Sequence, residues 1–115
     1  MKEGDVVLAQ LPQADGRLKI RPAVFLRKMP PFGDVLVCGI STQVHQAVRG
    51  FDEVVTAADD DFSGSGLKGT SIIRLGFLAL VPAENIAGKV GTIAVERHCR
   101  LLSRLCEHLR PKEKT

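Results

Sequence analysis

The sequence contains no tryptophan and no tyrosine, and phenylalanine occurs only 5 times in 115 residues. Recognition of single-stranded nucleic acid by extensive base stacking needs aromatic side chains, so this sequence supports it poorly. No apolar run approaches the roughly 20 residues that a membrane-spanning helix requires. The first residues, MKEGDVVLAQLPQADG, lack the apolar segment of a signal peptide because charge and glycine interrupt it. We therefore expect a cytoplasmic protein without a membrane segment.

Cysteine and the common catalytic motifs are also scarce. Cys38, Cys99 and Cys106 are an odd number with no C-x-x-C pair, which indicates neither a disulfide framework nor a zinc site. We expect all three to be buried free thiols, with Cys99 and Cys106 on one face of a helix. The three histidines are widely separated, and the sequence contains no P-loop, no G-x-S-x-G and no H-E-x-x-H. We expect no metal and no cofactor.

The remaining composition is ordinary for a globular protein. Hydrophobic residues make up 44% of the chain and charged residues 25%, and the formal net charge is +3. A length of 115 residues predicts a single domain over residues 1–115. The small positive charge favours an anionic partner without identifying one.

Short runs rich in β-branched residues predict strands over residues 4–11, 21–28, 34–42, 51–57 and 70–81. Asp15-Gly16 indicates a turn between the first two strands, and Gly76 indicates a bend or bulge in the last. Residues 43–50 and 58–69 are interpreted as loops, with Asp59, Asp60 and Asp61 as a solvated run. Residues 83–93 are interpreted as a connector.

The spacing of apolar residues changes from the strand period to the helix period near the C-terminus and predicts an amphipathic helix over residues 94–109. Thr92 is the expected N-cap, and residues 110–115 are expected to be a frayed tail. The expected apolar stripe, either core or dimer interface, is Val95, Cys99, Leu102, Cys106 and Leu109. The expected polar face is Glu96, Arg97, Arg100, Arg104 and Glu107. Together the elements predict a mainly β fold, a small curved antiparallel sheet or partial barrel with a C-terminal helix packed on it.

Polar and cationic side chains lie at the ends of two predicted strands. Arg21 begins the second strand, and Ser41, Thr42 and Gln43 end the third. Antiparallel strands place the start of one beside the end of its partner, so Arg21 and Ser41 could face one pocket. A guanidinium fork and a hydroxyl donor suit a phosphate oxygen that gains charge in a transition state. The structural alternative is that Arg21 pairs with a surface carboxylate and Ser41 only ends a strand.

Several blocks of the sequence resemble the MazF/PemK family, the toxins of bacterial toxin–antitoxin pairs. They match at Gly4-Asp5 in the first strand, at Arg-Pro-Ala-Val (21–24) in the second and at Ile-Ser-Thr-Gln (40–43) in the third. Residues 66–78 resemble a further block that carries an arginine on an apolar strand, here Arg74. The order and spacing of these blocks, from about residue 4 to residue 109, carry the resemblance.

The resemblance implies a homodimer of small SH3-like barrels, each with a terminal helix. It implies a sequence-preferring, metal-independent endoribonuclease, an mRNA interferase, that cleaves single-stranded RNA by attack of the RNA's own 2′-OH. It also implies a cognate antitoxin, which we expect to be acidic and partly disordered. Arg21 would stabilise the charge on phosphorus, and Ser41, at the position of the family's threonine, would donate to a nonbridging oxygen. The further RNA-binding residues would be Arg17, Lys19, Thr42, Gln43, His45 and Arg74.

The sequence also departs from the family pattern. Ser41 lacks the methyl group of threonine, and the loop before Arg21 has only Asp15 where many relatives have a glutamate. The group that deprotonates the 2′-OH is therefore open, and His45 is a candidate because histidine titrates near neutral pH. Two other functions are also open. One is a gyrase-poisoning toxin of the same fold, which would depend on the terminal helix, and the other is a non-catalytic SH3-like binding module or degenerate toxin.

Overall fold

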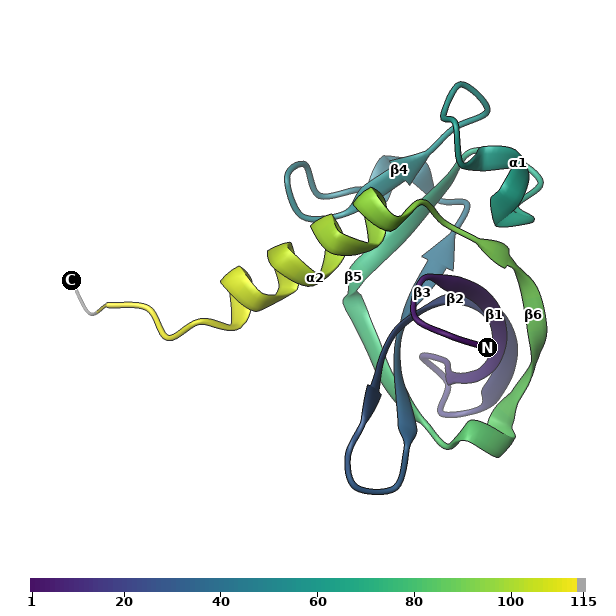
Figure 1. Ribbon diagram of the computed structural model, residues 1–115, viewed down its shortest axis with the longest axis vertical. Coiled ribbons are helices and arrows are strands. Elements are labelled where there is room, and N and C mark those ends of the chain that lie inside the picture. Colours follow the sequence, from purple (N-terminus) through teal and green to yellow (C-terminus); the bar gives the residue numbers. More distant parts are fainter. Residues whose placement is uncertain (114–115) are drawn as a thin grey trace.

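The computed structural model describes residues 1–113, which form a six-stranded antiparallel sheet and a long C-terminal helix (Figure 1). The strands are β1 (Asp5–Pro12), β2 (Leu18–Met29), β3 (Asp34–Ser41), β4 (Glu53–Val55), β5 (Ser71–Val81) and β6 (Ile86–Thr92). The helices are α1 (Phe62–Ser65) and α2 (Val95–Leu109), with 3₁₀ turns η1 (Val44–Gln46) and η2 (Ala83–Asn85). The strand order is β4-β5-β3-β2-β1-β6, and the sheet curls into a half-barrel. The predicted mainly β fold with a C-terminal helix is confirmed.

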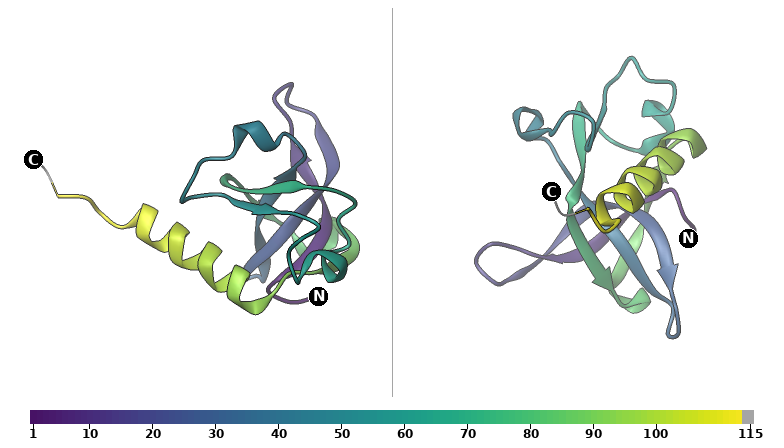
Figure 2. Two further views of the ribbon diagram at one scale, coloured as in Figure 1. Left: turned by 90° about the horizontal axis from the view of Figure 1, so that it is seen from above. Right: turned by 90° about the vertical axis from the view of Figure 1, so that its left-hand side faces the viewer.

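Apolar residues pack on both faces of the curled sheet. One cluster includes Val24 and Ile73 and is covered by Leu101 and Leu105 of α2. The second cluster joins residues of β1, β2 and β3 to residues of β5 and β6, so it fills the inside of the curl. Burial on both faces explains why the predicted strands are nearly continuous apolar runs instead of alternating ones. Seen from its other sides, α2 runs along the barrel and carries the chain end away from it (Figure 2).

The connector expected over residues 83–93 is wrong, because most of it is strand β6. The glycines of this segment have low strand propensity, so the sequence does not indicate a strand. The segment is nevertheless a strand because it pairs with β1 through backbone hydrogen bonds. One glycine, Gly91, is required by packing: a Cβ there would lie 2.3 Å from the backbone carbon of Ser65. The loop over residues 58–69 likewise contains the short helix α1, which packs against β6 at this point.

The predicted helix is confirmed over Val95–Leu109, but of the two interpretations of its apolar stripe, core or dimer interface, the core one is mostly wrong. The buried residues of α2 are Arg97, Leu101 and Leu105. Val95 and Leu109 are 74% and 67% exposed, and both Cys99 and Cys106 are exposed rather than buried. Of the expected stripe, Leu102 is half-buried against the core, and the core interpretation is wrong for its other four members. Cys38 alone matches the expected buried thiol, and burial raises its pKa to about 12.

Arg97 is buried because it enters a cluster of charges at the start of α2. Its guanidinium donates to both carboxylate oxygens of Asp61, at 2.8 and 3.0 Å, and to Glu53 Oε1 at 2.9 Å. Glu53 also accepts hydrogen bonds from Arg100 and Arg104. The predicted solvated acidic run is thus wrong for Asp61, whose side chain is 9% exposed. This buried charge cluster, Glu53, Asp61, Arg97, Arg100 and Arg104, fixes α2 to β4 and to the segment before α1.

Gly4 and Asp5 join the N-terminus to the beginning of α2. Gly4 has a φ of 90°, and its backbone bonds to Phe25 and Ile93. The Asp5 carboxylate is buried and accepts hydrogen bonds from the Lys2 amide at 2.8 Å and from the Thr92 hydroxyl at 3.1 Å. Thr92 is therefore not the N-cap of α2 as predicted. The Gly4-Asp5 block therefore has a structural role: its hydrogen bonds hold the N-terminus against the segment that precedes α2.

Of the predicted tail, residues 110–113 follow α2 without regular structure, and residues 114–115 lie outside the described residues. Within residues 1–113, none of the helices is both long enough and apolar enough to cross a membrane.

Candidate functional site

Strand pairing brings the ends of β2, β3 and β5 together. Ala23 pairs with Gly39 in β3, and Gly39 pairs with Arg74 in β5. Continuing the β2–β3 register by two residues places Arg21 opposite Ser41. Residues that are opposite one another or two apart along a strand share a sheet face, so Arg21, Ser41 and Arg74 point to the same side.

These residues line one pocket of about 540 Å³. Its walls carry two arginines, two hydroxyls and three amides: Arg21, Arg74, Ser41, Thr42, Gln13, Gln43 and Gln46. Apolar residues complete the lining, and no aspartate or glutamate contributes to it. The volume is within the range of about 300–1,000 Å³ that small-molecule sites occupy. A cationic pocket with hydroxyl and amide donors suits a phosphorylated ligand.

A bulge in β5 shapes the pocket floor. Cys38 pairs with Leu78 but the next residue, Gly39, pairs with Arg74, so three residues of β5 bulge out between these pairs. The bulge confirms the prediction made from Gly76 and places Phe77 against Gly39. A Cβ at Gly39 would lie only 2.8 Å from the Phe77 ring. Glycine is therefore required here for the ring to lie on the strand.

Ser41 is oriented by its own backbone turn. Its Oγ accepts a hydrogen bond from the Gln43 amide at 3.0 Å. This local turn partly replaces the methyl group that orients a threonine side chain. Because Oγ acts as the acceptor in that bond, the hydroxyl hydrogen is free to donate to a ligand.

Arg21 is exposed and does not make the surface ion pair that the structural alternative requires. Among residues 1–113, the arginines within 4.0 Å of a carboxylate oxygen are Arg27, Arg97, Arg100, Arg104 and Arg110. The Arg21 guanidinium is therefore available to a ligand in the pocket.

The other predicted site residues fall in two groups. Thr42, Gln43 and Arg74 line the pocket with Arg21 and Ser41. Arg17 and Lys19 line a neighbouring cavity on the β1–β2 turn instead. Gln13 lines both cavities, so it connects the two groups of cations.

His45 is not among the pocket-lining residues. It is exposed on η1, so the structure does not bring this candidate base to Arg21 and Ser41. Asp15 accepts a hydrogen bond from the Arg17 amide at 2.9 Å and holds the predicted turn. In the described part of the chain, His, Cys, Asp and Glu side chains form no group of three that could hold a metal ion.

Sequence reasoning missed Gln13, Gln46 and Phe77 as pocket residues. Gln13 follows β1, Gln46 lies on η1 and Phe77 lies in the β5 bulge. Their approach depends on two loops and a register shift, so spacing in the sequence gives no signal for it.

A family model for the PemK-like, MazF-like toxin of type II toxin–antitoxin systems matches residues 2–109. The chain belongs to this family. A solved structure, the Mycobacterium tuberculosis toxin MazF-mt6, superimposes with a TM-score of 0.65 over 90% of this chain and 93% of that one, at 21% sequence identity. At this identity the likeness establishes the fold. No curated protein sequence matches the chain.

Membership of the PemK/MazF family implies an antitoxin partner and dimers of the MazF kind. The sequence blocks that resemble the family have two different roles in the structure, one in holding the fold together and one in lining the pocket. Gly4-Asp5 builds the joint at the start of α2, whereas Arg21, Ser41 and Arg74 meet at the pocket.

Proposed function

We propose that the protein is a metal-independent endoribonuclease that cleaves single-stranded RNA, and that it is the toxin of a toxin–antitoxin pair. The observation that carries this proposal is the convergence of Arg21, Arg74 and Ser41 in one pocket without a lining carboxylate. Two guanidinium groups and a free hydroxyl donor match a phosphodiester that gains charge during cleavage.

In the proposed reaction the 2′-oxygen attacks the adjacent phosphorus and loses its proton. The bond from phosphorus to the 5′-oxygen breaks, and that oxygen takes up a proton. The products are a 2′,3′-cyclic phosphate and a 5′-hydroxyl, so atoms balance without an added water or cofactor. Arg21 stabilises the charge on the equatorial oxygens, and Ser41 donates to a nonbridging oxygen. Thr42, Gln43 and Arg74 hold the same nucleotide in the pocket.

The cavity beside the pocket provides a path for the RNA backbone. Arg17 and Lys19 lie on the β1–β2 turn, next to Gln13, which also lines the pocket. Exposed cations attract phosphates independently of sequence, and salt weakens that attraction. These two residues therefore serve to bind RNA, whereas Arg21 and Ser41 act on the bond that breaks.

The proposal predicts cleavage of a long unstructured RNA by the purified protein in EDTA. Products should carry 2′,3′-cyclic phosphate ends, detectable by resistance to phosphatase until acid opens the ring. Intact RNA at micromolar protein would contradict the nuclease. Inhibition of gyrase supercoiling by the same preparation would then identify the gyrase-poisoning function, and its absence would favour the binding module.

We also propose that the exposed apolar residues around α2 form the homodimer interface. Leu78 and Leu80 project from β5, and Leu80 pairs in register with Leu36 of β3. Leu36 lines a groove of about 570 Å³ together with Leu102 and Cys106 of α2. Leu102 and Cys106 of the α2 stripe and the adjoining residues of β3 and β5 thus form one apolar region, which is typical of an interface.

The wild-type protein should sediment as a dimer at micromolar concentration. Leu80→Glu combined with Leu109→Glu should produce monomers, because both side chains are more than half exposed and would place charge in the interface. Leu18→Glu is the matched control, since Leu18 is 60% exposed and lines the cavity at the β1–β2 turn instead of the α2 groove. A monomeric wild-type protein, or equal dissociation by the control, would refute the interface.

The antitoxin is proposed to be an acidic, partly disordered chain that orders on binding. Support comes from the net charge of +3 and from the cations that line both cavities. An acidic segment would compete with RNA for these groups.

A further inference from the structure

We propose that Gln13 and Gln46 read one RNA base next to the cleaved bond, while Phe77 supports its ring. The inference rests on the proposed nuclease function and adds which residues determine its sequence preference. The starting observation is that amides share the pocket with the phosphate-binding groups. Phosphate oxygens only accept hydrogen bonds, so they use the N–H donors of an amide and leave its carbonyl oxygen without a partner. Amide side chains are, however, suited to base edges, because one group offers both a donor and an acceptor.

Gln13 is the better anchored of the two amides. Its side chain is half-buried, and its Nε2 donates to the Leu11 carbonyl at 3.1 Å. Its backbone is held on both sides of the turn, by Arg17 O at 2.8 Å and by the Gly16 amide at 2.9 Å. The fixed side chain retains a free Oε1 acceptor and a second N–H donor. A preorganised group of this kind discriminates between bases better than a mobile one does.

Gln46 enters the pocket from η1, on another loop. Its side chain is exposed and makes no hydrogen bond to another side chain or to backbone in residues 1–113. Its amide is therefore free to pair with a base that Gln13 positions. The aromatic ring of Phe77, half-buried on the pocket floor, offers an apolar surface to the base. Reading one base requires only one aromatic ring for stacking, so this proposal is compatible with the small number of aromatic residues in the chain.

The location of Gln13 favours a base next to the cleaved phosphate. Gln13 lines both the pocket with Arg21 and the cavity with Arg17 and Lys19. RNA that follows the cations from one cavity to the other must pass this amide. Bases of single-stranded RNA are read on their exposed Watson–Crick edges, which is possible at such a junction.

The test is to sequence the cleavage sites of a randomised RNA for the full-length wild-type protein and for Gln13→Glu and Gln46→Glu. Glutamate offers only acceptors, and guanine alone presents adjacent N–H donors on its Watson–Crick edge. We expect the relative preference at one position to move toward guanine by about 5- to 150-fold, the effect of one good bidentate pair. Gln10→Glu is the control, since Gln10 is exposed on β1 outside the pocket and carries the same change of charge.

The readout is the relative preference among sites and not the absolute rate, because any added carboxylate repels phosphate and slows cleavage at every site. Unchanged site preference in both variants, with cleavage retained, would refute the base-reading role and leave the nuclease proposal intact. Binding of a randomised 2′-deoxy pool provides the second readout. Shifted enrichment in Gln13→Glu without any RNA cleavage by wild type would support base reading and refute the nuclease. Neither cleavage nor enrichment by wild type would overturn both. Melting curves of each variant verify that it is folded.

Discussion

Replacing Arg21 with alanine should lower the rate of RNA cleavage by at least about 10²–10³-fold, the effect of removing one donor that stabilises transition-state charge. Arg21 is exposed in a pocket without lining carboxylates, and it makes no ion pair within residues 1–113. Its removal should therefore leave the fold intact. The loss should fall on kcat more than on KM, because the charge develops only in the transition state. Single-turnover rates on a defined oligonucleotide measure it.

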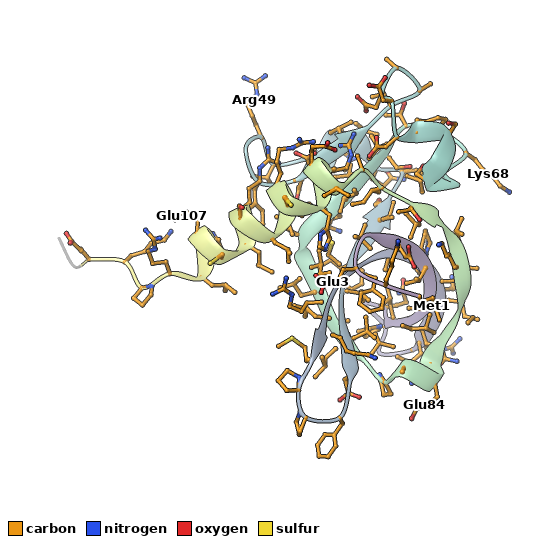
Figure 3. All side chains as sticks on the ribbon, in the orientation of Figure 1. Met1, Glu3, Arg49, Lys68, Glu84 and Glu107 are labelled. Atoms are coloured by element: carbon orange, nitrogen blue, oxygen red, sulfur yellow. The ribbon has the colours of Figure 1, made fainter. Side chains whose placement is uncertain are left out.

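Further variants of Arg21 and Ser41 separate the effect of charge from the effect of hydrogen-bond geometry. Arg21→Lys should recover little activity, since an ammonium cannot reproduce the planar fork. Ser41→Ala should be milder than Arg21→Ala, and Ser41→Thr should keep or raise activity by restoring the family's side chain. Arg49→Ala is the matched control for charge: Arg49 projects outward from the loop before β4 (Figure 3) and should affect cleavage little.

The opposite pattern would assign Arg21 to the fold. If Arg21→Ala unfolds while Arg21→Met is stable and still cleaves RNA, the residue is a structural part of the sheet edge. Circular dichroism and sedimentation of each variant distinguish this outcome from a loss of catalysis.

The main part of this site could be predicted because it depends on strand pairing. Arg21 and Ser41 stand at the start and end of neighbouring antiparallel strands, and antiparallel pairing brings such ends together. Arg74 required the family resemblance, because the β5 bulge shifts its register by three residues. Gln13 and Gln46 were not predicted, since loop conformation alone brings them to the pocket.

In the fold, too, some features follow from local sequence patterns and others depend on contacts between residues that are far apart in the sequence. Strands β1 to β5 and helix α2 follow from runs and periods within the sequence, whereas β6 depends on its pairing with β1. The orientation of α2 does not follow from them, because hydrophobic periodicity favours burial of Cys99 and Cys106, which are exposed, while the structure buries Arg97. The partners of Arg97 are Glu53 and Asp61, which are 44 and 36 residues away. A buried arginine is stable only with such partners, so the face that α2 buries depends on contacts that no local pattern contains.

The buried charge cluster therefore controls where the α2 stripe points. Glu53 is 7% exposed and accepts hydrogen bonds from Arg97, Arg100 and Arg104. Asp61 adds a hydrogen bond from the Ala94 amide, at 3.0 Å, and so stabilises the first turn of α2. Loss of this cluster would release the helix that carries the proposed dimer interface. Stability and assembly are consequently expected to change together.

The cluster also makes stability depend on pH. Burial alone would raise the pKa of Glu53, but the hydrogen bond from Arg100 and the charges of the three arginines hold it below its ordinary value. The hydrogen bond from Arg97 lowers the pKa of Asp61 in the same way. In the window below the ordinary values of about 4.3 and 3.9, the unfolded chain binds more protons than the folded one. The stabilisation is therefore complete above these values and is lost as pH falls through the folded pKa values.

Glu53→Gln should lower the free energy of unfolding by about 3–5 kcal/mol, because it keeps the shape of the side chain but removes the carboxylate charge that buried Arg97 shares with Arg100 and Arg104. Glu107→Gln is the matched control: its pair with Arg110 has both side chains 69% exposed, so stability should change little.

Urea unfolding at pH 7 and pH 4 measures the free energy of unfolding of both variants. The Glu53→Gln defect should shrink modestly at pH 4, because below about 4.3 the Glu53 carboxylate of the unfolded wild-type chain binds protons while the folded one stays charged. Sedimentation of Glu53→Gln should also show a weaker dimer. Wild-type stability of Glu53→Gln at pH 7 would mean that apolar contacts of Leu101 and Leu105 suffice to hold α2 in place.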